Sequence, residues 1–169
     1  MSDNINEVFI DRTQVLAIQV LVAGLVVSAL FFAIIVIVFT LPGVVQVQHA
    51  DSGRGGTNIT ILTGITLLAT ATAIPVSNML FMNNLNQLKD TSVPLVQLRT
   101  AYVVRFAILE GAALIGLFII LLAAVGDQLI GNYMIWLNAI PFLWMMLVFI
   151  TNYPSLERLK SLYNQYTAL

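Results

Sequence analysis

The sequence contains no cysteine, a single histidine and very little charge. The absence of cysteine excludes disulfides, thiol catalysis, and metal or iron–sulfur sites with cysteine ligands. His49 alone cannot build a multi-histidine metal site within one chain. A net charge of −1 provides no field that would attract nucleic acid. We therefore expect no metal, no cofactor and no nucleic-acid partner.

Apolar residues dominate the composition instead. Hydrophobic residues make up 59% of the 169 residues and charged residues only 9%. Soluble domains contain about 25% charged residues, and a soluble chain of this length could not bury so much apolar surface. The composition indicates that most of the surface of the chain faces a lipid bilayer, and the bilayer is therefore an expected partner. We expect a single transmembrane domain over residues 1–169.

Four apolar runs are each long enough to cross a bilayer as a helix, which takes about 20 residues. They predict spans over residues 15–41, 59–82, 100–125 and 129–151. Pro42-Gly43 ends the first run, and Pro75 and Pro141 are expected to kink the second and fourth spans. The predicted fold is an all-α polytopic membrane four-helix bundle.

The segments outside the four runs are polar. Residues 1–14 predict a tail at the interface, and residues 44–58 predict an exposed glycine-rich loop that contains His49, Asp51 and Arg54. The segment 154–169 has apolar residues at helical spacing, with charged residues between them; these apolar residues are Leu156, Leu159, Tyr163 and Tyr166. This pattern predicts a C-terminal amphipathic interfacial helix.

The basic residues predict the orientation of the spans. Four spans place both termini on one side, together with Arg12, Lys89, Arg99, Arg105, Arg158 and Lys160. The other side has only Arg54. Because basic residues accumulate on the cytoplasmic side, both termini are expected there. The chain is thus expected to be a multi-pass protein of a bacterial inner membrane.

The second span carries a stripe of hydroxyl and small side chains. Steps of three and four residues place this stripe on one helix face; its members are Thr63, Thr66, Thr70, Ala73 and Ser77. Small and hydroxylated faces favour close helix packing in lipid. We therefore expect the second span to pack tightly against the third.

Glu110 is the most unusual residue of the third span. Counted from Thr100 at ~1.5 Å per residue, it lies about 15 Å deep, near the middle of a bilayer. An ionised carboxylate facing lipid there costs at least a few kcal/mol, so Glu110 must be protonated, paired or sheltered. Arg105 can reach the cytoplasmic surface, and a direct pair with Glu110 within the helix is poor because five residues turn a helix through about 140°. Pairing of the two through side-chain reach, or with groups on the second span, stays open.

The antiparallel second span supplies the expected neighbours of these two residues. Thr66 and Thr70 fall at the depth of Glu110, and Ser77 and Asn78 fall near the depth of Arg105. Small residues around the acid allow a neighbouring backbone to come close; these are Ala107, Gly111, Ala112 and Gly116. The candidate ion or proton site therefore consists of Glu110, Arg105, Thr66 and Thr70.

Two functional interpretations of Glu110 remain open. In the first, the protein is a non-enzymatic accessory or structural subunit of a membrane assembly, and a protonated Glu110 links helices by a hydrogen bond. In the second, Glu110 is the titrating site of a component that handles protons or cations. A homo-oligomer or other membrane subunits are the candidate partners. No nucleophile–base pair or cofactor motif predicts an enzyme.

The second half of the chain resembles a group of small four-span bacterial membrane proteins. The resemblance lies in two patterns, Tyr102-x-x-Arg105-x-Ala107-x-x-Glu110-Gly111-Ala112-Ala113 and the closing Tyr153-Pro154-Ser155-x-Glu157-Arg158-Leu159. It implies a four-span architecture and a bacterial setting, but no activity.

A shorter stretch resembles the second helix of the rotary ATP synthase proteolipid. In the proteolipid family, an arginine-bearing loop precedes a span whose central acid carries the ion. In this sequence, Leu98-Arg99-Thr100 precedes Ala107-Ile-Leu-Glu110-Gly in the same order. This resemblance implies Glu110 as an ion carrier. The glycine-repeat helix of that family has no counterpart in this sequence.

Overall fold

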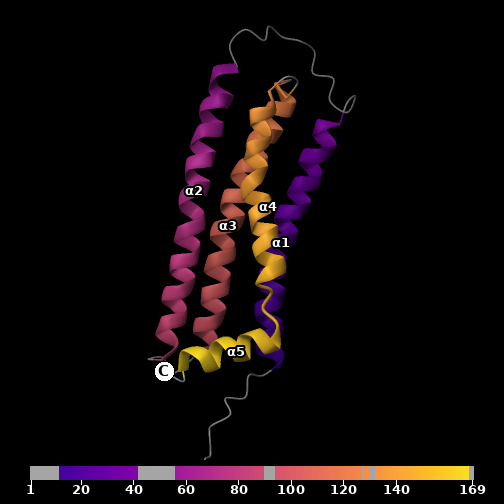
Figure 1. The fold of residues 1–169 in the computed structure, drawn as a ribbon. Coiled ribbons are helices and arrows are strands. Elements are labelled where there is room, and N and C mark those ends of the chain that lie inside the picture. The colour runs from indigo at the N-terminus through magenta and orange to yellow at the C-terminus, as the bar shows by residue number, and fades with distance from the viewer. Residues whose placement is uncertain (1–11, 42–55, 90–93, 127, 130–131, 168–169) are drawn as a thin grey trace, which may run out of the picture.

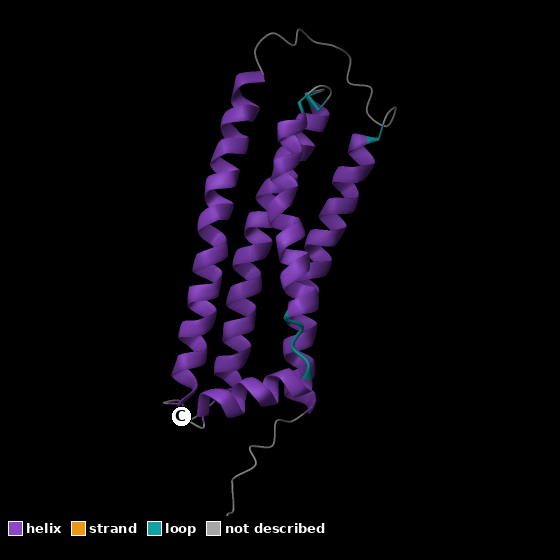
Figure 2. Ribbon diagram, in the orientation of Figure 1, coloured by secondary structure: helices purple, strands orange, loops and turns teal. Residues whose placement is uncertain are grey.

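The computed structural model describes residues 12–41, 56–89, 94–126, 128–129 and 132–167. Every regular element in these ranges is a helix (Figure 2). The elements are α1 (Arg12–Thr40), α2 (Gly56–Asn86), η1 (Gln87–Lys89), α3 (Pro94–Val125), η2 (Tyr133–Ala139), α4 (Ile140–Thr151) and α5 (Leu156–Thr167). The expectations for residues 1–11 and 42–55, including His49, Asp51 and Arg54, lie outside the described residues.

The third helix in the sequence is the central helix of the fold. α3 packs against α1, against α2, and against η2 and α4, whereas α1 and α2 have no substantial interface within the described residues. The long helices run alternately up and down, and α5 lies across one end of the bundle (Figure 1). The start of α1 lies at the same end as α5, as expected for an even number of spans.

The helices bury one face each and expose apolar residues on the other. In α1 the buried residues recur every three or four positions; they are Val15, Ile18, Val22, Val26, Ala29, Ala33 and Val36. The opposite faces are equally apolar, and Phe31 and Leu68 are 65% and 71% exposed. Four helices, Arg12–Thr40, Ile59–Asn86, Pro94–Val125 and Tyr133–Thr151, are long and apolar enough to cross a membrane. This confirms the all-α fold with four candidate spans.

The prolines near the spans lie in different settings. α2 continues through Pro75 as one α-helix, and α3 begins at Pro94, ahead of residue 100, where the third span was predicted to begin. Pro94 can open a helix because the first N–H groups have no intrahelical partner. Pro141 does not kink one continuous helix. It lies in the first turn of α4, directly after the 3-10 helix η2.

The change from 3-10 to α-helix before Pro141 has a simple cause. An α-helix would need the N–H of residue 141 to donate to the carbonyl of Leu137, and proline has no N–H. The N–H of Ile140 donates to that carbonyl instead, which is the three-residue spacing of a 3-10 helix. The fourth span is therefore built from two helical pieces joined at Pro141.

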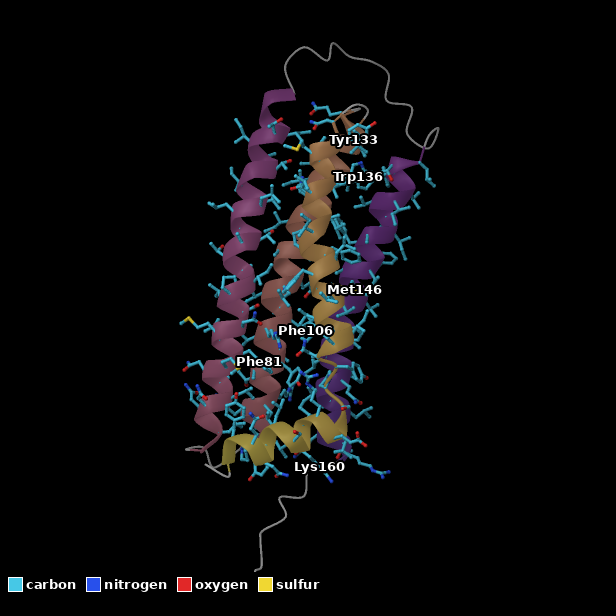
Figure 3. All side chains as sticks on the ribbon, viewed as in Figure 1. Phe81, Phe106, Tyr133, Trp136, Met146 and Lys160 are labelled. Carbon is cyan, nitrogen blue, oxygen red and sulfur yellow. The ribbon has the colours of Figure 1, made fainter. Side chains whose placement is uncertain are left out.

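The amphipathic character of α5 is confirmed. Leu159 is fully buried and Leu162 packs partly against the core, whereas Glu157 and Lys160 are exposed. Tyr133 and Trp136 lie at the opposite end of the bundle from Lys160 (Figure 3). Aromatic residues near a helix end are typical of membrane interfaces.

Candidate functional site

Glu110 connects α3 to α1. Its Oε1 atom accepts a hydrogen bond from the hydroxyl of Ser28, a residue of α1 that is 82 positions away in sequence. The hydroxyl of Ser28 also lies 2.8 Å from the carbonyl oxygen of Leu25 in its own helix. The acid is therefore part of a polar contact between two helices whose other residues here are apolar.

The expected threonine partners of Glu110 are occupied elsewhere. The hydroxyl of Thr66 donates to the carbonyl of Leu62 at 3.0 Å, and that of Thr70 donates to the carbonyl of Thr66 at 2.7 Å. Thr66 and Thr70 are buried, so the predicted packing face of α2 is confirmed. However, the hydroxyl partner of Glu110 is Ser28 of α1, and the partnership predicted from depth alone was wrong.

The helical angle between Arg105 and Glu110 explains this difference. The guanidinium of Arg105 reaches α2, where its Nη2 donates to Oδ1 of Asn78 at 2.8 Å. Five residues turn the helix through about 140°, so Glu110 leaves α3 on a side that faces away from α2. α1 packs against that other side and supplies Ser28.

Arg105 is buried and does not extend to the surface, contrary to expectation. The residue is 8% exposed, and its Cζ atom lies 4.7 Å from the centroid of the Phe81 ring. A guanidinium above an aromatic ring is attracted by the electrons of the ring face. Asn78 and Phe81 therefore hold the cation between α2 and α3, while its buried Nε atom has no hydrogen-bond partner among the described residues.

A second polar contact joins α2 to the fourth span. Asn138 of η2 is fully buried, and its Nδ2 atom donates to the Thr63 hydroxyl at 2.9 Å and to the Ile135 carbonyl at 2.8 Å. On the other side of this segment, a Cβ atom at Gly116 would lie 2.1 Å from the backbone oxygen of Asn138. The expected close approach at Gly116 thus occurs, and its partner is a backbone carbonyl of η2.

We predict that Asn138 and Thr63 are energetically coupled. Asn138→Ala and Thr63→Val should each destabilise the fold, and the double variant should lose less than the sum of the two. The coupling should be about 0.6–1.7 kcal/mol, the range of hydrogen bonds between helices in lipid. The measurement is a double-mutant cycle of the unfolding free energy in mixed detergent micelles.

A matched cycle with Thr66 provides the control. Thr66 is buried on the same face of α2, but its hydroxyl bonds within its own helix. Thr66→Val combined with Asn138→Ala should therefore be additive within about 0.5 kcal/mol. Equal coupling in both cycles would contradict a specific Asn138–Thr63 bond.

The Ser28–Glu110 contact lies at the outer edge of the α1–α3 interface. Ser28 is exposed and Glu110 is half-buried. Cβ atoms added at Gly24 and Gly111 would meet nothing within 4 Å, so both glycines face open space. This side of the fold therefore presents small residues next to an acid, and no helix of the described part of the chain approaches Gly111 closely.

The sequence indicated that Ser28 has a partner on another helix, but the depth of the residues in the membrane could not identify that partner. Ser28 is the only residue with a polar side chain between Leu21 and Phe39. A lone hydroxyl in such a run indicates a partner on another helix. Its match to Glu110 becomes evident only once α1 is known to pack on the side of α3 that faces away from α2.

Searches of protein-family models, curated proteins and solved structures found no match to the chain. The functional interpretation therefore depends on the contacts of Ser28, Glu110 and Arg105. The two resemblances noted in the sequence stay predictions.

Proposed function

We propose that the protein is an integral membrane protein of a bacterial inner membrane, with both termini in the cytoplasm. Four helices of sufficient length and hydropathy support insertion. Positive charges near the α5 end support the orientation, because basic residues favour the cytoplasmic side; they include Arg12, Arg99, Arg158 and Lys160. The bacterial setting comes from the sequence resemblance.

Within that membrane, the proposed role is that of a non-enzymatic accessory or structural subunit. The observation that carries this proposal is the hydrogen bond between Ser28 and Glu110, which ties α1 to α3. The outward surface beside it contains Gly24 and Gly111. Small residues let another helix approach closely in lipid. A second copy of the chain or another membrane subunit is therefore the proposed partner of this surface.

A count of hydrogen-bond donors supports a neutral Glu110. The Ser28 hydroxyl has one proton but two neighbouring acceptors, the Leu25 carbonyl and Glu110. If Glu110 is protonated, it donates to the Ser28 oxygen while Ser28 donates to Leu25, so that both contacts are satisfied. A neutral acid also avoids the cost of an ionised group in lipid.

Three variants test this structural role. Glu110→Gln retains a donor and an acceptor, so its unfolding free energy should stay within about 0.5 kcal/mol of the original chain. Glu110→Ala and Ser28→Ala each remove the bond and should each cost about 1 kcal/mol. Unfolding in mixed micelles measures all three. If Glu110→Gln destabilises as much as Glu110→Ala, the neutral hydrogen-bond role is wrong.

The alternative function is handling of a proton or cation by Glu110. The place of this carboxyl group inside an apolar helix favours it, because ionisable residues within spans mark ion and proton paths. Proton flux into liposomes containing a pH-sensitive dye distinguishes the two functions. Flux that depends on the protein and disappears in a normally folded Glu110→Gln variant would establish ion handling. Equal flux in both proteins leaves the structural role.

A further inference from the structure

A groove opens between α1 and α3 near the end of the bundle where α5 lies. Its volume is about 340 Å³. Its walls are apolar side chains, and an arginine and a threonine lie among them; the lining residues are Leu21, Val96, Arg99, Thr100, Val103 and Val104. The groove belongs neither to the Glu110 contact nor to the buried Arg105.

The polar part of the groove is cationic. Arg99 and Thr100 are exposed and lie in the second turn of α3. The Thr100 hydroxyl donates to the Val96 carbonyl at 2.9 Å. Within the described part of the chain, no acceptor is recorded for the guanidinium of Arg99. A guanidinium next to valine and leucine walls fits a ligand with an anionic head and an apolar tail.

The position of Arg99 along α3 also fits such a ligand. Eleven residues separate Arg99 from Glu110, which is about 16 Å along the helix. Half of a hydrocarbon core is about 15 Å thick. The expected position of the third span, with its edge at Thr100 and Glu110 near the middle of the bilayer, places Arg99 at the level of the lipid headgroups.

We propose that the α1–α3 groove binds one anionic phospholipid of the cytoplasmic leaflet. The headgroup phosphate pairs with Arg99, and one acyl chain lies against Leu21, Val103 and Val104. This inference depends on the membrane placement proposed above. A chain that is removed from membranes by an alkaline carbonate wash would refute that placement itself, whichever lipid the purified protein retains.

The test measures which lipids the intact protein retains. The full chain is reconstituted in bilayers of equal parts phosphatidylglycerol and phosphatidylcholine with identical acyl chains, extracted in mild detergent, and examined by native mass spectrometry. The original chain should retain phosphatidylglycerol in preference to phosphatidylcholine. Arg99→Gln should lower the ratio of the two retained lipids about fivefold, because a basic residue at an anionic surface contributes ~1 kcal/mol.

Two further variants separate the groove from general surface charge. Lys160→Gln removes one exposed positive charge from α5 at the same end of the bundle (Figure 3) and should leave the ratio unchanged. Val103→Trp fills the groove and should lower the retention of both lipids, while circular dichroism verifies that it is folded. If Val103→Trp does not fold, the lipid ratios retained by Arg99→Gln and Lys160→Gln are sufficient to test the proposal.

Several outcomes would overturn the proposal. Equal retention of the two lipids by the original chain would exclude selection by headgroup charge. Equal effects of Arg99→Gln and Lys160→Gln would assign the preference to surface charge. A folded Val103→Trp variant that retains as much lipid as the original chain would show that no acyl chain lies in the groove. A lipid-free dimer mass that disappears in Val103→Trp would make a second copy of the chain the occupant.

Discussion

Gly116→Ala should destabilise the protein by at least about 2 kcal/mol. The added Cβ would lie 2.1 Å from the backbone oxygen of Asn138, and that carbonyl belongs to the 3-10 segment that precedes Pro141. Backbone cannot rotate away as a long side chain can, so α3 and η2 would have to separate. The measurement is the unfolding free energy in mixed micelles, followed by circular dichroism.

Gly111→Ala provides the matched control on the same helix. A Cβ atom at Gly111 would meet nothing within 4 Å, so the substitution adds no clash. Alanine is favoured over glycine in a helix by up to ~1 kcal/mol, and the variant should be neutral or slightly more stable. Equal losses at residues 111 and 116 would show that close approach to η2 is not the cause.

Asn78→Leu should cost about 1.5–3 kcal/mol, the usual contribution of a hydrogen bond to a charged group. The substitution removes the Oδ1 acceptor of Arg105 and leaves that cation with the face of Phe81. Asn78 is itself exposed, so leucine meets no steric conflict there. The loss of stability would come from the charge of Arg105, which stays buried after the substitution but no longer has its acceptor.

Arg105→Met provides the test of this explanation. Methionine is apolar and flexible enough to pack over the Phe81 ring, and it removes the charge that needs the acceptor. Arg105→Met should therefore cost less than Asn78→Leu, and the double variant should recover most of the loss. If Arg105→Met is at least as destabilising as Asn78→Leu, the cation contributes more than its burial costs, and the explanation is wrong.

The architecture was largely accessible from the sequence, because apolar runs of this length have few alternatives to a long helix. The amphipathic pattern of α5 and the packing stripe of α2 followed from helical spacing. The joint at Pro141 differed from expectation. It depends on whether a particular backbone N–H is needed, which hydropathy does not report.

The partners of the site residues were less accessible. Depth predicted Thr66 and Thr70 as the partners of Glu110, and only the side on which α1 docks selects Ser28. The burial of Arg105 depends on Phe81, which lies 24 positions earlier on another helix. The contact of Gly116 depends on a carbonyl exposed by a 3-10 turn. Such information lies in the packing of helices, and periodicity within one helix cannot supply it.

The central position of α3 has a consequence for biosynthesis. α1 and α2 leave the ribosome first, yet their described residues share no substantial interface, and both pack against α3. Until α3 has been synthesised, α1 and α2 lack the helix against which both of them pack. Assembly of the bundle therefore waits for the third long helix.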